Sequence, residues 1–316
     1  MKHGFQPFLL AFWCLLVPVK AQTQIEWFSA QNATNLAANG VSAMDASFRF
    51  ELGVFTGSFV PTSLNVAEWS ENWNVARGNA AELNAIQRVR YLADLKRFGG
   101  RFTVESATAP FTAGKAAYVW GFKGDPAEGE WILFRAASWT WPSAAIGPPA
   151  FLLWEAKDAT AVLGTINLSG SPFLMQAAAV ANAVPPITTW PQWQADELAG
   201  ETLIQPHEDA DGDGTANILE FIFGTSPLSR NPSPIAPAAL ANLSGEKYLQ
   251  LSIPRRADRP ATLVVEVSED LSVWNNGTGH TATVSSSTTA LTVRDLIPVS
   301  PTAPKRFIRL RVSPEP

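Results

Sequence analysis

Short apolar runs bounded by turn-forming residues recur along this chain and constrain its fold more than any other feature. Near the C-terminus, Ile308, Leu310 and Val312 alternate with Arg309 and Arg311. Strict alternation is typical of a strand with one face against a core and the other in solvent. Segment 245–316 holds several such strands and no helical period. We therefore expect a small antiparallel β-sandwich module there.

Six further runs in residues 22–186 are rich in β-branched and aromatic residues and end at Gly, Pro or Asn. They read ASFRFELGVF, GRFTVES, AAYVWGFKG, EWILFRAASWTW, PAFLLWEA and TAVLGTINL. Only 16% of the chain is charged, which disfavours long solvated helices. The sequence therefore predicts a mainly β fold, with a tryptophan-rich β domain at the N-terminal end.

Two segments of this domain favour helix instead. Residues 61–76 place Val66, Trp69 and Trp73 on one helical face, with Thr62 or Ser63 as N-cap. Residues 79–100 form a second candidate helix.

The first 21 residues have the pattern of a secretory signal peptide. Lys2 precedes an apolar run from Phe8 to Val19, and small residues around Ala21 suit signal peptidase. The run is too short to span a membrane as a mature helix, and no second long apolar segment follows. We expect Sec-type export to a secreted, extracellular or cell-surface location, with no membrane span after cleavage.

Cleavage changes the charge and thiol content of the chain. It removes Lys2 and Lys20 and no acids, leaving 21 basic against 28 acidic residues and a net charge of −7. An acidic protein without a basic stripe is not expected to bind nucleic acid. Cys14, the one cysteine, leaves with the signal, so the mature chain has no disulfide or thiolate site.

A helical connector follows the first domain at residues 187–228. Thr189 and Gln192 fit a capping box, and Gly200 ends the helix PQWQADELAG. Prolines then mark a stiff spacer over 229–244.

The connector contains an acidic loop, HEDADGDGTANILEF. An EF-hand-type loop has its ligands at positions one, three, five, seven, nine and twelve. When Asp209 is counted as position one, these positions are occupied in order by Asp209, Asp211, Asp213, Thr215, Asn217 and Glu220. Gly214 at the sixth position permits the sharp turn. Calcium prefers six to eight oxygens at about 2.3–2.6 Å, and alternate side chains of such a loop supply them. We expect a calcium ion, with Glu220 giving both oxygens and Thr215 its carbonyl.

A solvated acidic turn held by Asx hydrogen bonds is the alternative interpretation. The exiting helix ANILEFIFG is predicted to end at Gly224, but Pro206 opposes a good entering helix. The loop is therefore a single, unpaired site. Such a site suits structural binding at extracellular calcium levels better than signalling.

The stretch DADGDGTANILEFIFGTSPL resembles dockerin-type and thrombospondin type-III calcium loops. It is similar to a segment of many secreted proteins of environmental bacteria, where it precedes a short C-terminal β-module. VEVSEDLSVW and RFIRLRV resemble the start and last strand of that module. The resemblance implies export and calcium binding, and no known activity.

Catalytic patterns are weak in this sequence. The histidines of the mature chain, His207 and His280, lie far apart and form no HExxH motif. Asp125, Glu128 and Glu130 cluster in KGDPAEGEW, which reads as a hairpin loop.

The tryptophans offer a second binding hypothesis. Trp139 and Trp141 in SWTWP would lie on one strand face, where exposed indoles stack on sugar rings. Large aromatics at this spacing are more often buried in a core.

We therefore predict a secreted, calcium-binding structural or binding protein without catalytic activity, whose partner is a polysaccharide or another cell-surface protein. A carbohydrate-binding protein using the tryptophan-rich domain is the alternative. A secreted hydrolase with an unrecognised acid pair is a weaker one.

Overall fold

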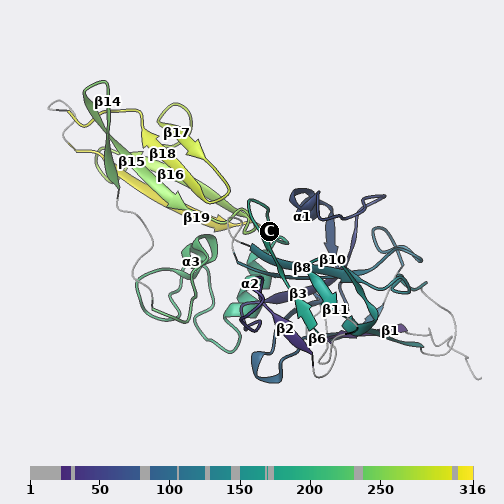
Figure 1. The fold of residues 1–316 in the computed structure, drawn as a ribbon. Helices are drawn as coiled ribbons and strands as arrows, with labels where there is room; N and C mark the ends of the chain where they lie inside the picture. The colour runs from purple at the N-terminus through teal and green to yellow at the C-terminus, as the bar shows by residue number, and fades with distance from the viewer. Residues whose placement is uncertain are drawn as a thin grey trace, which may run out of the picture.

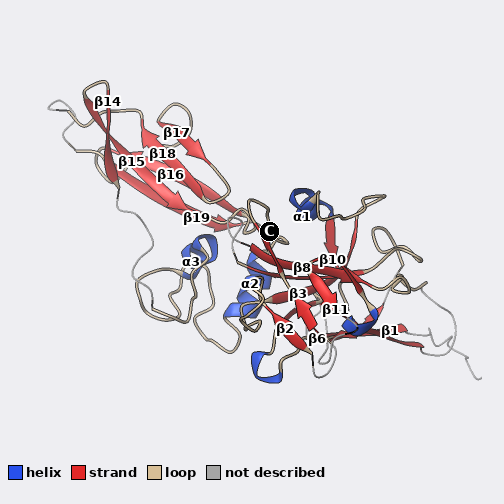
Figure 2. Cartoon of the chain, viewed as in Figure 1, coloured by secondary structure: helices blue, strands red, loops and turns tan. Residues whose placement is uncertain are grey.

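The computed structural model describes residues 23–29, 33–78, 86–104, 107–124, 129–143, 150–167, 169, 174–230, 238–300 and 305–315. The predicted signal peptide and residues 231–237 of the predicted proline spacer lie outside the described residues. The chain is mainly β with short helices mid-chain, which confirms the predicted fold class (Figure 2). No helix among the described residues is long and apolar enough to cross a membrane.

The N-terminal region is built from three sheets (Figure 1). The largest has the order β10-β8-β7-β3-β4, with β5 beside β3 and β13 beside β8; its strands are β3 (Arg49–Phe55), β4 (Trp73–Val75), β5 (Arg88–Arg90), β7 (Tyr118–Lys123), β8 (Gly129–Arg135), β10 (Thr160–Leu163) and β13 (Ala178–Val180). The other two sheets are β6-β1-β9 and β11-β12-β2, from β1 (Thr23–Phe28), β2 (Thr34–Leu36), β6 (Gly99–Val104), β9 (Ala150–Glu155), β11 (Thr165–Asn167) and β12 (Leu174–Gln176).

The central sheet separates two apolar cores, because successive side chains of a strand point to opposite faces. On β8, Ile132 and Phe134 belong to one core, whereas Trp131 and Leu133 belong to the other. Both faces of the sheet are therefore covered. This explains why its strands read as continuous apolar runs rather than alternating ones.

The prediction of one helix over 61–76 is wrong, because only residues 66–72 are helical. A 3₁₀ turn η1 (Val66–Glu68) and a single α-turn α1 (Trp69–Asn72) form there, and Trp73 begins strand β4. β4 pairs with β3, and the Trp73 ring packs edge-on to Phe55 at a centroid distance of 5.0 Å. Sheet pairing thus overrides the helical spacing.

The second predicted helix, 79–100, is also wrong where the chain is described; residues 79–85 lie outside that part. Strand β5, a 3₁₀ turn η2 (Ala93–Leu95) and the start of β6 occupy the rest. A third such turn, η3 (Ala156–Asp158), follows β9. β5 is extended because it pairs with β3 and buries Val89.

The connector contains helices α2 (Trp190–Glu197) and α3 (Asn217–Phe223), as predicted. The Thr189 N–H donates to Gln192 Oε1 at 2.7 Å, the reciprocal bond of a capping box. Gly224 ends α3 in the left-handed conformation, with φ at 85°.

The C-terminal module consists of two antiparallel sheets, β14-β15-β18-β17 and β16-β19. Their strands are β14 (Ala239–Leu243), β15 (Glu246–Pro254), β16 (Ala261–Ser268), β17 (Thr281–Ser286), β18 (Ala290–Asp295) and β19 (Phe307–Pro314). On β19, Arg309 and Arg311 are exposed, whereas Ile308, Leu310 and Val312 beside them are partly buried. β14 begins inside the segment predicted as spacer.

The connector shares its core with this module. Trp193 and Phe221 belong to the same apolar cluster as Leu251, Ile253 and Val265 of the two C-terminal sheets. Backbone bonds reinforce the contact, since the N–H of Arg256 donates to the carbonyl of Ile222 at 2.9 Å. The helices of the connector are therefore packed onto the sandwich (Figure 1).

Candidate metal centre

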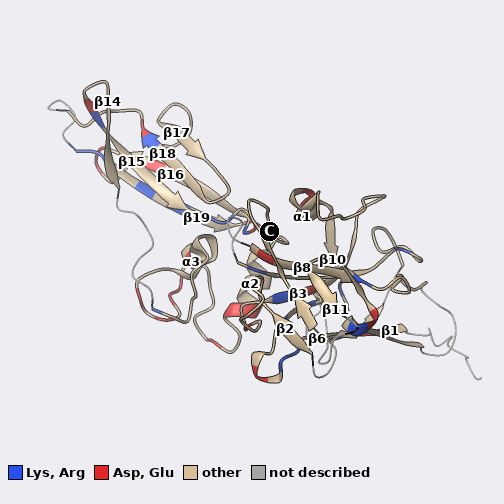
Figure 3. Ribbon diagram, in the orientation of Figure 1, with Lys and Arg blue, Asp and Glu red and all other residues tan. Residues whose placement is uncertain are grey.

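The acidic loop is closed at its base by backbone hydrogen bonds. The N–H of Asn217 donates to the carbonyl of Glu208 at 2.7 Å, and the N–H of Ile218 donates to that of Pro206 at 2.9 Å. Figure 3 marks the acidic residues along the loop that leads into α3. The first turn of α3 thus holds both ends of the loop together.

Within the loop the carboxylates accept hydrogen bonds from the backbone. Asp209 accepts from the N–H groups of Gly212 at 2.8 Å and Gly214 at 2.7 Å. Asp211 accepts from Asp213 at 3.0 Å. Gly214 has a φ of 94°, a conformation that side-chain-bearing residues rarely adopt.

This winding brings three carboxylates together. One oxygen from each of Asp209, Asp211 and Asp213 lies within 4.8 Å of the others, and such a group can hold a metal ion. The sequence prediction of a clustered acidic loop is confirmed. Hydrogen bonds from backbone N–H groups offset part of the repulsion between the carboxylates.

Glu220, on helix α3, is not part of this group of three carboxylates, although its charge interacts with those of Asp211 and Asp213. Its side chain is 0% exposed. Oε1 accepts from the Thr225 hydroxyl at 3.3 Å, whereas Oε2 has no partner, and neither has the buried Oδ2 of Asp211. Burial, with further contributions from Asp211 and Asp213, raises the pKa of Glu220 to about 8.

These two orphaned oxygens test whether the residues fit a cation. A buried polar atom without a partner costs about 1–3 kcal/mol, and a buried negative charge costs more. A cation bound to both oxygens would remove both of these costs. The donor set is carboxylate oxygen without nitrogen or sulfur, which suits hard cations.

Asn217 and Thr215 are both buried. The Asn217 side chain links the loop to the segment before it. Its Nδ2 donates to the carbonyls of Leu203 at 2.9 Å and Gln205 at 3.1 Å. Its Oδ1 accepts from the N–H of Ala210 at 3.3 Å. The N–H of Thr215 donates to Asp213 Oδ1 at 2.7 Å.

Arg230 is a loop contact that sequence reasoning missed. Its Nε donates to the carbonyl of Asp211 at 2.8 Å. It lies beyond the twelve-residue spacing, so no local pattern could have revealed it.

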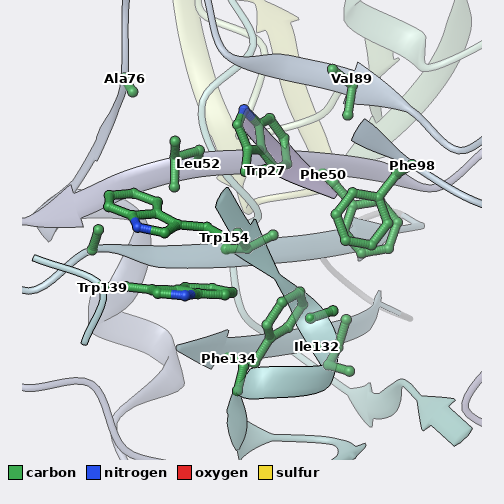
Figure 4. Packing of buried hydrophobic residues seen from close by; sticks show 14 of the residues in the cluster. Trp27, Phe50, Leu52, Ala76, Val89, Phe98, Ile132, Phe134, Trp139 and Trp154 are labelled. Atoms are coloured by element: carbon green, nitrogen blue, oxygen red, sulfur yellow. The ribbon is translucent and has the colours of Figure 1, made fainter. Parts of the chain in front are cut away.

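The structure buries Trp139 and Trp141, which confirms the favoured prediction that both rings lie in a core and excludes the alternative of an exposed sugar platform there. They are 2% and 3% exposed, and they follow β8 rather than belonging to it. Trp139 stacks on Trp154 at a centroid distance of 5.8 Å (Figure 4). A ring enclosed by other aromatics has no free face for a ligand.

Of the three acidic residues in KGDPAEGEW, the structure describes Glu130, whereas Asp125 and Glu128 lie outside the described residues. Glu130 accepts from the N–H of Ala38 at 2.6 Å and lies 3.5 Å from Lys123 Nζ. Its carboxylate therefore has structural partners.

No protein-family model matches the chain, and comparison with curated proteins and with solved structures gives no match either, so the dockerin-like and thrombospondin-like family is not shown.

Proposed function

We propose that this chain is an exported, non-catalytic structural or binding protein in which a calcium ion secures the connector to the C-terminal sandwich. Asp209, Asp211, Asp213 and Glu220 would hold the ion through carboxylate oxygens, with the carbonyl of Thr215 completing the shell. The observation that carries the proposal is the buried Glu220 carboxylate with an oxygen that no protein group satisfies.

Helix α3 transmits the effect of the ion to the module. Glu220 and Phe221 are neighbours on this helix, and Phe221 packs against Trp190 and Trp193 at 5.6 Å from each ring. The two indoles contact each other at 5.2 Å, so Phe221 lies edge-on against the pair. The Phe221 carbonyl accepts from Arg259 Nη1 at 2.8 Å. A cation that holds Glu220 in place therefore also stabilises the contacts of Phe221 between the connector and the sandwich.

Calcium is favoured over magnesium by the form of the loop. Magnesium requires near-octahedral geometry at about 2.0–2.1 Å, whereas calcium accepts more oxygens at longer and more variable distances. A wrapped loop with several carboxylates supplies the second environment. A single site of this kind suits a structural role at extracellular calcium levels.

Calorimetric titration of the mature protein tests the choice of ion. We expect one calcium per chain and much weaker binding of magnesium. If neither ion gives a binding heat and calcium leaves the melting curve unmoved, the loop is an acidic turn and the proposal fails.

Export is the second part of the proposal, and it rests on the pattern of residues 1–21. The mass of the protein recovered from the medium or cell surface should correspond to a chain that begins near Gln22. Recovery of a chain that still begins at Met1 would exclude cleavage. A polysaccharide or another cell-surface protein is the partner class we propose for such a protein.

A further inference from the structure

A cavity of about 540 Å³ lies where the N-terminal region meets the start of the connector. Its walls come from β4 and the residues after it, from the loop that carries Phe111, and from Ile187 and Gln192 of the connector. Cavities of about 300–1,000 Å³ at the junction of two chain regions are common binding sites for small molecules.

One part of the lining is aromatic and apolar. Trp73 and Phe111 are half-buried, and Phe111 lies 4.6 Å from Trp141 between ring centroids. Ile187 is 42% exposed at the same cavity. Trp73 is held in place because its Nε1 donates to Glu51 at 2.6 Å. The ring positions are therefore set before any ligand arrives.

The other part of the lining is polar and positively charged. Arg77 is exposed and has no ion pair with any carboxylate of the described residues. Gln192 uses its Oε1 for the helix cap, and its Nε2 makes no hydrogen bond within the described part of the chain. Glu51, the acidic residue among the described lining, is 1% exposed and already bonded to Arg88. Among the described lining residues, the charge presented to a ligand is therefore that of Arg77.

These two kinds of wall restrict the chemistry of the occupant. An apolar ligand would take water from Arg77 and Gln192 without replacing their hydrogen bonds. A small inorganic anion would leave the aromatic rings uncovered. A pyranose ring has C–H faces that pack on aromatic rings and hydroxyls that hydrogen-bond at its edge. A carboxylate on that ring is the natural partner of an unpaired guanidinium.

We propose that this cavity binds a saccharide unit that carries a carboxylate. Its ring packs against Trp73 and Phe111, its carboxylate faces Arg77, and one of its oxygens accepts from Gln192. The proposal is independent of the calcium site, because none of these residues belongs to the acidic loop. It assigns carbohydrate recognition to side chains other than the buried Trp139.

Titration of the mature protein with cellobiouronic acid, cellobiose and benzoate tests the inference. The first two probes share a disaccharide framework and differ in the carboxylate, and benzoate supplies a carboxylate on an aromatic ring. We expect cellobiouronic acid to bind about tenfold or more tightly than cellobiose, the scale of one charge-assisted hydrogen bond. Benzoate should bind more weakly than cellobiouronic acid. Each titration is performed with calcium and with chelator, so that failure of either proposal is seen separately.

Variants then locate the site. Arg77→Gln should remove the preference for the acidic sugar, so that cellobiouronic acid and cellobiose bind about equally. Ile187→Glu, which places a negative charge at the cavity, should weaken cellobiouronic acid more than cellobiose. Arg101→Gln is the matched control, since Arg101 is an exposed arginine of the same region paired with Glu26 at 2.8 Å. Melting curves verify that each variant is folded. Three results would overturn the inference: no binding of either disaccharide, equal binding of benzoate, or an unaltered preference in Arg77→Gln.

Discussion

Chelation of calcium should lower the melting temperature of this protein by about 5–10 °C, and Glu220→Gln should abolish that response. A ligand that binds only the folded state adds about 2.7 kcal/mol at a hundredfold excess over its Kd. For a unit of this size each kcal/mol corresponds to about 2–4 °C. Scanning calorimetry with calcium and with chelator measures both quantities.

The same substitution gives the opposite result without calcium. Glu220 is buried near Asp211 and Asp213, and its raised pKa shows that the protein disfavours its charged form. Glutamine is neutral at the same size, so the chelated variant should melt at or above the chelated wild type. Glu201→Gln is the control, because Glu201 is exposed and precedes the loop. A variant that loses stability equally in both conditions would show that Glu220 has a packing role and does not bind the ion.

Local patterns in the sequence predicted the acidic loop and the helices beside it. The alternation of Asp209, Asp211 and Asp213 sets their approach within a few residues, and the structure brings their oxygens together. Capping residues likewise fixed the start of α2 and the end of α3, since a cap acts on its own helix turn.

Predictions that depended on distant partners were less successful. Trp73 was assigned to a helix by its spacing, but pairing with β3 makes it a strand residue. The prolines suggested that connector and module are separate, whereas Phe221 and Val265 share one core. In each case the deciding contact is remote in sequence, so no local period contains it.

The buried ion pair between Glu51 and Arg88 is a further remote contact, and breaking it should destabilise the protein strongly. The two residues face each other across β3 and β5, with Arg88 Nε 2.5 Å from Glu51 Oε1. They are 1% and 5% exposed. Arg88→Met leaves the Glu51 charge buried with only Trp73 as a described hydrogen-bond donor. We expect a loss of about 3–5 kcal/mol in the free energy of unfolding, measured by denaturant titration.

Arg88 also joins the N-terminal region to the connector. Its Nη1 donates to the Thr188 hydroxyl at 2.7 Å and its Nη2 to the carbonyl of Ile187 at 3.2 Å. Arg101→Met, which breaks the exposed pair with Glu26, should cost less than about 1 kcal/mol because solvent screens that pair. The double variant Glu51→Leu with Arg88→Met removes both buried charges. It should therefore be more stable than Arg88→Met alone, although the bonds to the connector stay lost. If the double variant is less stable than Arg88→Met, the cost arises from packing and connector contacts, and the unpaired carboxylate is not its main source.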